Sequence, residues 1–291
     1  MKLRKHKLTI IVTLVLLIIV SVSSFLLITK VFSKSDKKIV IKKDMPLILI
    51  PGTSATGDRF DDFITQMAAK VGDKDVIKLK VQPDGTVEWT ATQNHKLVNP
   101  FIVISFVDSS EETVGKQAKW VQLALKKAHT LCNFDTYNAI GHSNGGLAWT
   151  IYLEQAPSQY TQKMQKLITL GTPFDTQLPL EKKTSSGVET IVETDMLKKL
   201  VAAKRKIPKS LDMISIAGEI ENNSGDGVVP LESVSSSKKI FQGQVASFTQ
   251  KNFYGSDAQH SELIGNPDVM NYIIHELYAN LGGTTPTKSA K

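Results

Sequence analysis

A serine flanked by glycines is the residue of this sequence best placed to do chemistry. The pentapeptide G-H-S-N-G occupies 141–145, an apolar run precedes it at 137–140, and a second apolar run follows it at 146–152. This order predicts a strand, a sharp turn and a helix, with glycines that let the strand and the helix pass closely. Such a turn lifts the serine oxygen clear of the sheet. We therefore predict that Ser143 is a nucleophile rather than part of an ordinary glycine-rich turn.

A nucleophilic serine needs a base and an acid, and two later segments offer them. A turn-rich loop at 222–230 follows a predicted strand and carries Asp226 between two glycines. A final strand predicted at 248–255 is followed by His260. Serine, acid and histidine thus come in the chain order that is usual for a nucleophile elbow. We predict that Asp226 orients His260, and that His260 is the general base for Ser143.

Other residues of the same types fit this order less well. Asp175 follows an earlier predicted strand, and Asp257 comes shortly before the histidine. The alternatives for the chosen pair are an Asx-turn role for Asp226 and a solvated loop histidine at position 260. The remaining histidines belong to the amino-terminal segment, an edge segment, helices or the serine turn itself: His6, His95, His129, His142 and His275.

Acyl transfer also needs hydrogen-bond donors for a developing oxyanion, and backbone N–H groups can supply them. An apolar strand predicted at 46–50 leads into the loop 51–58, where the N–H of Thr53 is the first candidate. The second is the N–H of Asn144, which opens a helix whose dipole favours negative charge. A plain connecting loop is the alternative. A phosphate-binding loop is excluded, because no Gly-Lys-Ser/Thr follows.

The surrounding elements alternate between strand and helix. An amphipathic helix over 114–128 joins two buried strands, and this arrangement implies parallel pairing with a right-handed connection. A polar insertion at 174–208 contains a short amphipathic helix and is either a lid over the site or a surface excursion. The strands are predicted at 46–50, 76–81, 101–107, 137–140, 166–170, 211–217 and 248–255.

The composition is that of a folded protein with one unusual end. The chain has 291 residues, of which 41% are hydrophobic, and its net charge is +7. Residues 1–43 hold ten of the Lys and Arg and a single acid, so the remainder is close to neutral and a nucleic-acid partner is not expected. Cys132 is the only cysteine, so the chain forms no internal disulfide, and its apolar setting favours a buried thiol. The spacings suggest no metal site and no cofactor.

The amino-terminal segment has the pattern of a membrane anchor. Residues 8–29 carry no charge and are long enough to cross a bilayer. The basic stub 1–7 should stay in the cytoplasm, and a lysine-rich tether at 30–43 should leave the domain 44–291 on the extracellular side of the cell membrane. A cleavable signal peptide is the alternative, but apolar residues continue past its small-residue cleavage site.

From about residue 47 to 281 the sequence resembles the α/β hydrolases. Within them it is similar to a group of membrane-bound cell-surface hydrolases of Gram-positive bacteria whose physiological role is unknown. The resemblance rests on four motifs, at 141–146, 171–174, 225–230 and 260–263. It implies an α/β fold with a mostly parallel central sheet and helices on both faces. The sequence departs from these relatives at Pro51, where they usually carry His, and at Asn144, where they commonly carry Met.

These residues predict a serine hydrolase that cleaves a small-molecule or lipid carboxylic ester through an acyl-enzyme. Amide and thioester substrates, and transfer to an acceptor other than water, stay open. The alternative from another class is a catalytically silent surface protein that keeps the hydrolase fold for binding or adhesion. A further alternative is a regulator that works through the tether.

Overall fold

The fold is seen in a computed structural model that describes residues 45–92, 97–161, 163–175, 181–183, 189–191, 193–220 and 225–278. All of them belong to one unit of the chain, Ile39–Lys291. The predicted stub, anchor and tether at 1–7, 8–29 and 30–43 lie outside the described residues. Within the described ranges, no helix is both long enough and apolar enough to cross a membrane.

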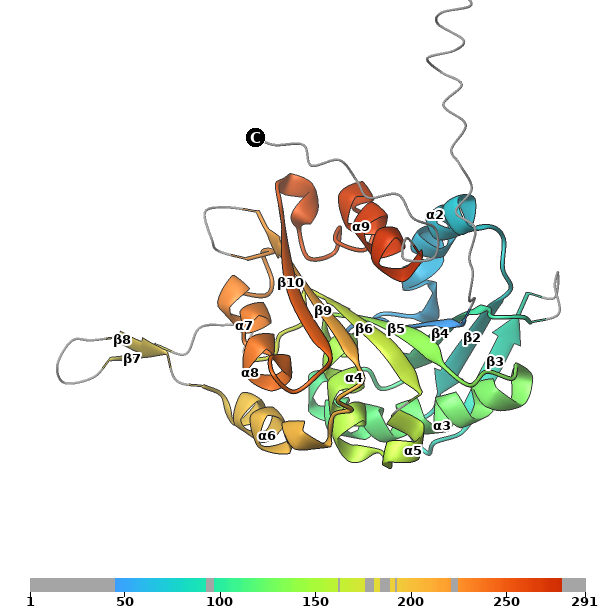
Figure 1. Ribbon diagram of the computed structural model, residues 1–291, viewed down its shortest axis with the longest axis horizontal. Helices are drawn as coiled ribbons and strands as arrows, with labels where there is room; N and C mark the ends of the chain where they lie inside the picture. Colours follow the sequence, from blue (N-terminus) through green and yellow to red (C-terminus); the bar gives the residue numbers. More distant parts are fainter. Residues whose placement is uncertain are drawn as a thin grey trace, which may run out of the picture. The chain divides into compact units, whose positions relative to one another are not determined.

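An eight-stranded sheet forms the centre of this unit (Figure 1). Its strand order is β10-β9-β6-β5-β1-β4-β2-β3, and every neighbouring pair is parallel except β2 and β3. The strands are β1 (Leu47–Ile50), β2 (Val76–Val81), β3 (Val87–Ala91), β4 (Phe101–Phe106), β5 (Tyr137–His142), β6 (Met164–Leu170), β9 (Asp212–Glu219) and β10 (Ser247–Tyr254). The predicted strands are therefore confirmed. Strand β3, which forms an antiparallel hairpin with β2 at the edge of the sheet, was not predicted from the sequence.

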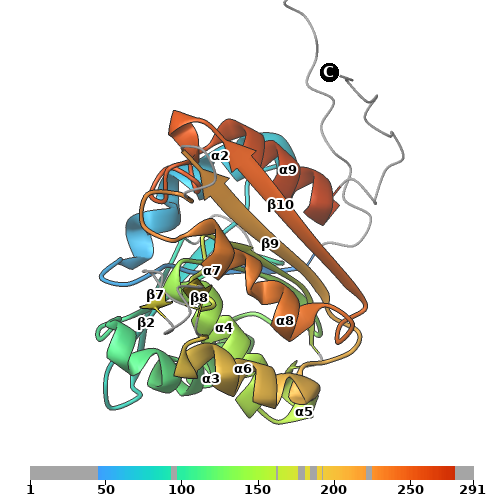
Figure 2. The same cartoon turned by 90° about the vertical axis from the view of Figure 1, so that its left-hand side faces the viewer.

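Helices cover both faces of the sheet, as predicted (Figures 1 and 2). Figure 1 shows α2 (Asp61–Val71) and α9 (Pro267–Tyr278) on one face, and α3 (Val114–Leu131) and α4 (Asn144–Gln155) on the other. The shorter helices are α5 (Ser158–Thr161), α6 (Asp195–Ala203), α7 (Leu231–Ser235) and α8 (Ser237–Phe241).

The central strand β1 is apolar at every position because both of its faces are covered. Leu47 and Leu49 pack into the core on the α2 and α9 side, whereas Ile48 and Ile50 pack into the core on the α3 and α4 side. Successive side chains of a strand point to opposite faces, so a strand covered on both faces needs apolar residues at every position. Four residues of β1 thus join two cores and lead directly into the loop that contains Thr53.

The insertion at 174–208 is described only in part. It contains an antiparallel pair, β7 (Glu181–Lys183) with β8 (Glu189–Ile191), followed by α6. The predicted amphipathic helix is confirmed, because Leu197 and Leu200 of α6 are buried in the core on the α3 and α4 side. The role of the insertion as a lid stays a prediction.

One buried carboxyl group lies on the helix that follows the serine. Glu154 of α4 is 4% exposed, and its Oε1 accepts no hydrogen bond from the described part of the chain. Burial raises the pKa of Glu154 from its ordinary value of 4.5 to about 8, and the positive charge of Lys206 opposes this only in part. The folded protein therefore favours the protonated form of Glu154.

We predict that Glu154 makes stability fall with rising pH. The folded state keeps the Glu154 proton up to about pH 8 and the unfolded chain releases it near 4.5, so stability is lost across this window. The loss is at most about 1.4 kcal/mol per pH unit. Glu154→Gln should match the wild type at the acidic end and exceed it at the alkaline end. Urea unfolding at both ends measures this, and a constant difference between the two proteins would contradict it.

Candidate active site

Ser143 lies in a strained turn between β5 and α4. Its backbone has φ 54° and ψ −130°, a conformation that residues other than glycine rarely adopt. Three hydrogen bonds hold the turn. The Ser143 N–H donates to the carbonyl of Leu170 (2.8 Å), and the Ser143 carbonyl accepts from Gly146 N–H (3.0 Å) and from Thr172 Oγ1 (3.0 Å). The predicted strand, turn and helix are therefore confirmed.

Two glycines allow the close approaches that this turn needs. A Cβ atom on Gly146 would lie 2.0 Å from Thr172 Oγ1, the same hydroxyl that bonds the Ser143 carbonyl. A Cβ atom on Gly52 would lie 2.6 Å from the Ser143 Cβ. Real side chains do not approach this closely, so both positions require glycine. The loop after β1 and the segment after β6 thus pack directly against the serine turn.

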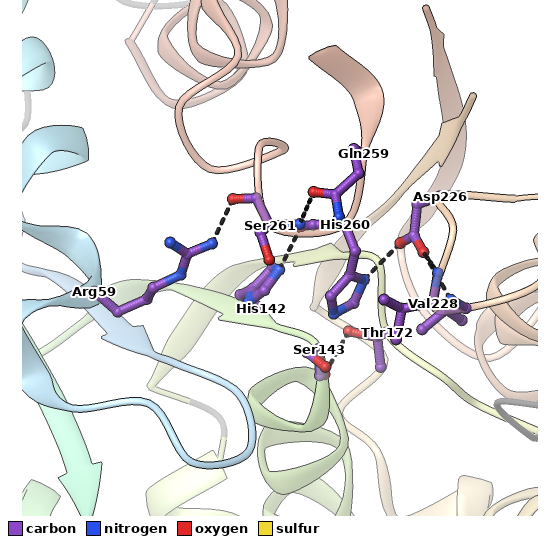
Figure 3. A network of polar contacts seen from close by, with 10 residues as sticks. Arg59, His142, Ser143, Thr172, Asp226, Val228, Gln259, His260 and Ser261 are labelled. Carbon is purple, nitrogen blue, oxygen red and sulfur yellow. Dashed lines mark hydrogen bonds and ion pairs between the residues drawn. The ribbon is translucent and has the colours of Figure 1, made fainter. Parts of the chain in front are cut away.

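His260 and Asp226 form a short hydrogen bond beside this turn (Figure 3). His260 Nδ1 lies 2.6 Å from Asp226 Oδ2, and both residues are buried. The other carboxylate oxygen, Oδ1, accepts from the backbone N–H groups of Val228 (3.0 Å) and Val229 (2.7 Å). A carboxylate can only accept, so the shared proton belongs on His260 Nδ1. In the neutral imidazole the Nε2 lone pair is then an acceptor.

Ser143 and His260 line one cavity of about 300 Å³. Figure 3 shows the His260 ring between Asp226 and Ser143, so the three residues lie in the order that proton transfer from serine to histidine requires. Thr53, Arg59 and other residues complete the lining. The structure thus brings together Ser143, Asp226 and His260, while their catalytic roles stay a prediction. No described residue of the insertion at 174–208 lines this cavity.

The two competing aspartates have other partners. Asp175 accepts the N–H of Thr194 on Oδ1 (2.8 Å) and the Thr194 hydroxyl on its backbone carbonyl (2.8 Å), so it holds the start of α6. Asp257 is exposed, and its carbonyl accepts from Asn266 Nδ2 (3.0 Å). Asp226 is the carboxylate at His260.

His142 also belongs to this site, in a contact that was not predicted from the sequence. Its Nε2 lies 2.9 Å from the backbone carbonyl of His260, and the two ring centroids are 4.7 Å apart. The pKa of His142 is lowered from 6.5 to about 3, mainly by burial, and the electrostatic interactions with His260 and Arg59 act in the same direction. A neutral His142 donates this bond from Nε2. Arg59 likewise donates to the carbonyl of Ser261, so two side chains hold the backbone of the histidine loop.

The two predicted oxyanion donors lie next to each other. Asn144 is the first residue of α4, directly after Ser143, and Thr53 lines the cavity that contains Ser143. The Asn144 side chain donates from Nδ2 to Thr53 Oγ1 (2.6 Å). The predicted oxyanion role involves only the backbone N–H of Asn144. The structure gives its side chain a part as well, because this bond ties the loop after β1 to the start of α4.

Possible metal ligands and the single cysteine were the other candidates for chemistry. Among the described residues, no group of three His, Cys, Asp or Glu side chains could hold a metal ion. Cys132 is buried at the end of α3, and burial raises the pKa of its thiol to about 11. The prediction of a buried thiol is confirmed, and this thiol is protonated at neutral pH.

The sheet topology and the serine turn define this protein as an α/β hydrolase. Residues 34–280 match the family described as alpha/beta hydrolase of unknown function (DUF915), and the chain belongs to this family. The resemblance inferred from the motifs is therefore confirmed. A comparison with curated proteins found no match.

Two solved structures are similar to this chain. One, from Lactobacillus plantarum WCFS1, is named as a cell surface hydrolase. It is 34% identical, with a TM-score of 0.68, and the match covers 84% of this chain and 94% of that chain. The other is the product of the gene lin2722 from Listeria innocua. It is 22% identical, with a TM-score of 0.71, and the match covers 84% of this chain and 97% of that chain. This second likeness shows the fold.

We predict that a methyl group at position 146 disrupts the serine turn. Gly146→Ala must displace Thr172 and break its bond to the Ser143 carbonyl, and the expected loss of stability is about 1–3 kcal/mol. The matched control is Gly115→Ala in α3, where an added Cβ meets nothing within 4 Å. This control should be neutral or stabilising by up to about 1 kcal/mol. Urea unfolding compares the two, and equal effects would contradict the packing argument.

Proposed function

We propose that this protein is a serine hydrolase that cleaves carboxylic esters. The observation that carries this proposal is the 2.6 Å bond between His260 Nδ1 and the buried Asp226, beside the cavity where His260 and Ser143 meet. A serine in a strained turn, an oriented imidazole and a satisfied carboxylate are the parts that acyl transfer needs. A protein that only binds a ligand does not need an imidazole oriented by a carboxylate beside a serine.

In the first half of the proposed reaction, His260 Nε2 takes the proton of the Ser143 hydroxyl, and Ser143 Oγ attacks the ester carbonyl carbon. Asp226 keeps the imidazole in the required tautomer and stabilises the imidazolium that forms. The tetrahedral oxyanion accepts hydrogen bonds from the N–H groups of Thr53 and Asn144. His260 then returns the proton to the alcohol oxygen, which leaves.

In the second half, water replaces the alcohol. His260 removes a proton from the water, the hydroxide oxygen attacks the acyl group on Ser143, and the carboxylic acid leaves as Ser143 Oγ regains its proton. The same two N–H groups serve both tetrahedral intermediates. The Asn144 side chain supports them by holding Thr53 in place, and His142 and Arg59 support the base through the backbone at 260–261.

We also propose that residues 8–29 anchor the protein in the cell membrane, with the domain 44–291 on the extracellular side. The charge-free length of 8–29 and the basic residues before it support this orientation. The Lactobacillus plantarum relative is named as a cell surface hydrolase, which agrees with it.

We predict that the full chain reacts with a fluorophosphonate probe and hydrolyses p-nitrophenyl acetate. Ser143→Ala should abolish labelling, and Asp226→Asn should lower kcat by at least about 10³-fold, because it orients His260 poorly. Asp257→Asn is the matched control, since Asp257 is an exposed aspartate near the same histidine, and it should keep wild-type turnover.

Labelling of Ser143→Ala, or equal losses in the two aspartate variants, would refute these roles. A folded wild-type protein that neither labels nor turns over would favour the alternative of a catalytically silent binding protein.

We predict that the full chain fractionates with membranes and resists extraction by alkaline carbonate, whereas a variant lacking residues 8–29 does not. External protease should digest the domain in intact cells, because it lies outside the membrane. A shortened mature chain released into the medium would instead identify 8–29 as part of a cleaved signal peptide.

A further inference from the structure

A second cavity, of about 930 Å³, opens beside the cavity of Ser143. The two share Thr53, Ala55 and Glu111 in their linings, so they are contiguous. We call the larger one the edge cleft, because it reaches from the loops 53–58 and 107–112 to strands β2 and β3 at the edge of the sheet. A substrate held at Ser143 can extend into this cleft.

The floor of the edge cleft is polar because of the strand register. Lys80 of β2 pairs with Ser105 of β4 on one side and with Glu88 of β3 on the other. Paired residues share a face, so these three polar residues form a row across the sheet. Lys78 and Thr90, two residues further along β2 and β3, extend the same face.

The helix that would normally cover this face stops short of it. Phe60 and Phe63, at the start of α2, pack with residues of β1 and β4, including Leu49 and Val103. The apolar core on this face therefore extends to Val103 of β4 and Val76 of β2, and polar side chains lie beyond it. Lys80, Glu88 and Thr90 among them are exposed.

Ion pairs hold the walls of the edge cleft in place. Lys78 Nζ lies 2.6 Å from Asp58 and 2.8 Å from Asp61, and these contacts tie the loop after β1 to β2. On the opposite wall, the Ser110 hydroxyl donates to Asp108 (2.8 Å). The cleft thus has ordered carboxylates, hydroxyls and ammonium groups before any ligand arrives.

We propose that the edge cleft binds the alcohol portion of a carbohydrate ester, an inference that rests on the proposed function. The enzyme would then remove a short acyl group from a sugar chain. Sugar hydroxyls both donate and accept hydrogen bonds, so they match a surface on which the exposed side chains of Glu88 and Lys80 place an acceptor beside a donor. A carboxylate can also accept from two neighbouring hydroxyls. The volume of the cleft is within the range of sites for ligands of several rings.

Few of the large apolar side chains in the lining are exposed to a ligand. The large apolar side chains that are exposed in the lining of the edge cleft are Trp89 and Val107. Trp89 pairs with Leu79, which belongs to the core on the α3 side, and Lys127 of α3 lies 5.5 Å from the Trp89 ring centroid. The ring thus lies on the face opposite to Lys80. A long alkyl chain in the cleft would desolvate lysine and carboxylate groups without replacing their hydrogen bonds.

In the proposed reaction, Ser143 Oγ forms a bond to the acyl carbon while the bond from this carbon to the sugar oxygen breaks. The sugar oxygen takes its proton from His260 and leaves as a hydroxyl. Water then releases the acyl group as a carboxylic acid. The edge cleft holds the sugar until the first step is complete, so its contacts act on carbohydrate esters and not on small aryl esters.

We test this with Thr90→Trp, which places a bulky ring on the floor of the edge cleft. The matched control is Thr249→Trp, because Thr249 is also an exposed threonine on an edge strand, β10 at the opposite side of the sheet. The substrates are O-acetylated xylo-oligosaccharides, p-nitrophenyl acetate and p-nitrophenyl palmitate. With the full-length protein, Thr90→Trp should lower kcat/KM for the acetylated oligosaccharides at least about tenfold and leave p-nitrophenyl acetate unchanged. The control should change neither.

Equal effects of the two tryptophan variants, or a wild-type preference for p-nitrophenyl palmitate, would overturn the inference while leaving the hydrolase intact. Binding gives a readout that does not depend on catalysis. Xylotetraose should bind to Ser143→Ala, and adding Thr90→Trp should weaken this binding at least about tenfold. If the wild type fails to label with the fluorophosphonate probe and xylotetraose still binds, the proposed catalysis fails and the cleft assignment stands. If xylotetraose does not bind, the cleft assignment fails.

Discussion

Close packing of the serine turn against the segment after β6 holds the centre of this site in place. Gly146 leaves space for Thr172, and the Thr172 hydroxyl bonds the Ser143 carbonyl. These contacts hold Ser143 at φ 54°, a strained conformation that persists only where the surroundings impose it. Strain and close packing together place Ser143 in the lining of a cavity, directly after the end of β5.

Parallel strands bring the remaining groups to the same place. The carboxyl ends of neighbouring parallel strands meet at one edge, so the loops after β9 and β10 deliver Asp226 and His260 to the end of β5. Burial of Asp226 would be costly for an isolated carboxylate, but two backbone N–H groups and His260 satisfy both of its oxygens. These contacts hold the Asp226 carboxylate in place, so that it can orient the imidazole of His260.

The face of the sheet that carries α2 is apolar at the central strands and becomes polar toward the edge strands β2 and β3. At β1, a position on the α2 side carries Leu49, whereas at β2 the same face carries Lys78 and Lys80. The difference follows from the reach of α2, which covers the middle of the sheet and not its edge. An exposed polar face beside the proposed nucleophile is available for recognition of a polar substrate.

Most of the helices and strands, and the residue types that could do chemistry, were predictable from the sequence alone. Continuous apolar runs identified the central strands, and the glycines around Ser143 identified the turn, because both signals depend on neighbours in the chain. The order of Asp226 and His260 on later strand ends predicted their partnership. Contacts between atoms of distant segments could be seen only in the folded structure. The bond from Asn144 to Thr53, the contact of His142 with the His260 backbone and the cleft beside β2 and β3 join segments tens of residues apart. Local patterns carry no signal for such contacts, since register, helix length and loop path together set them.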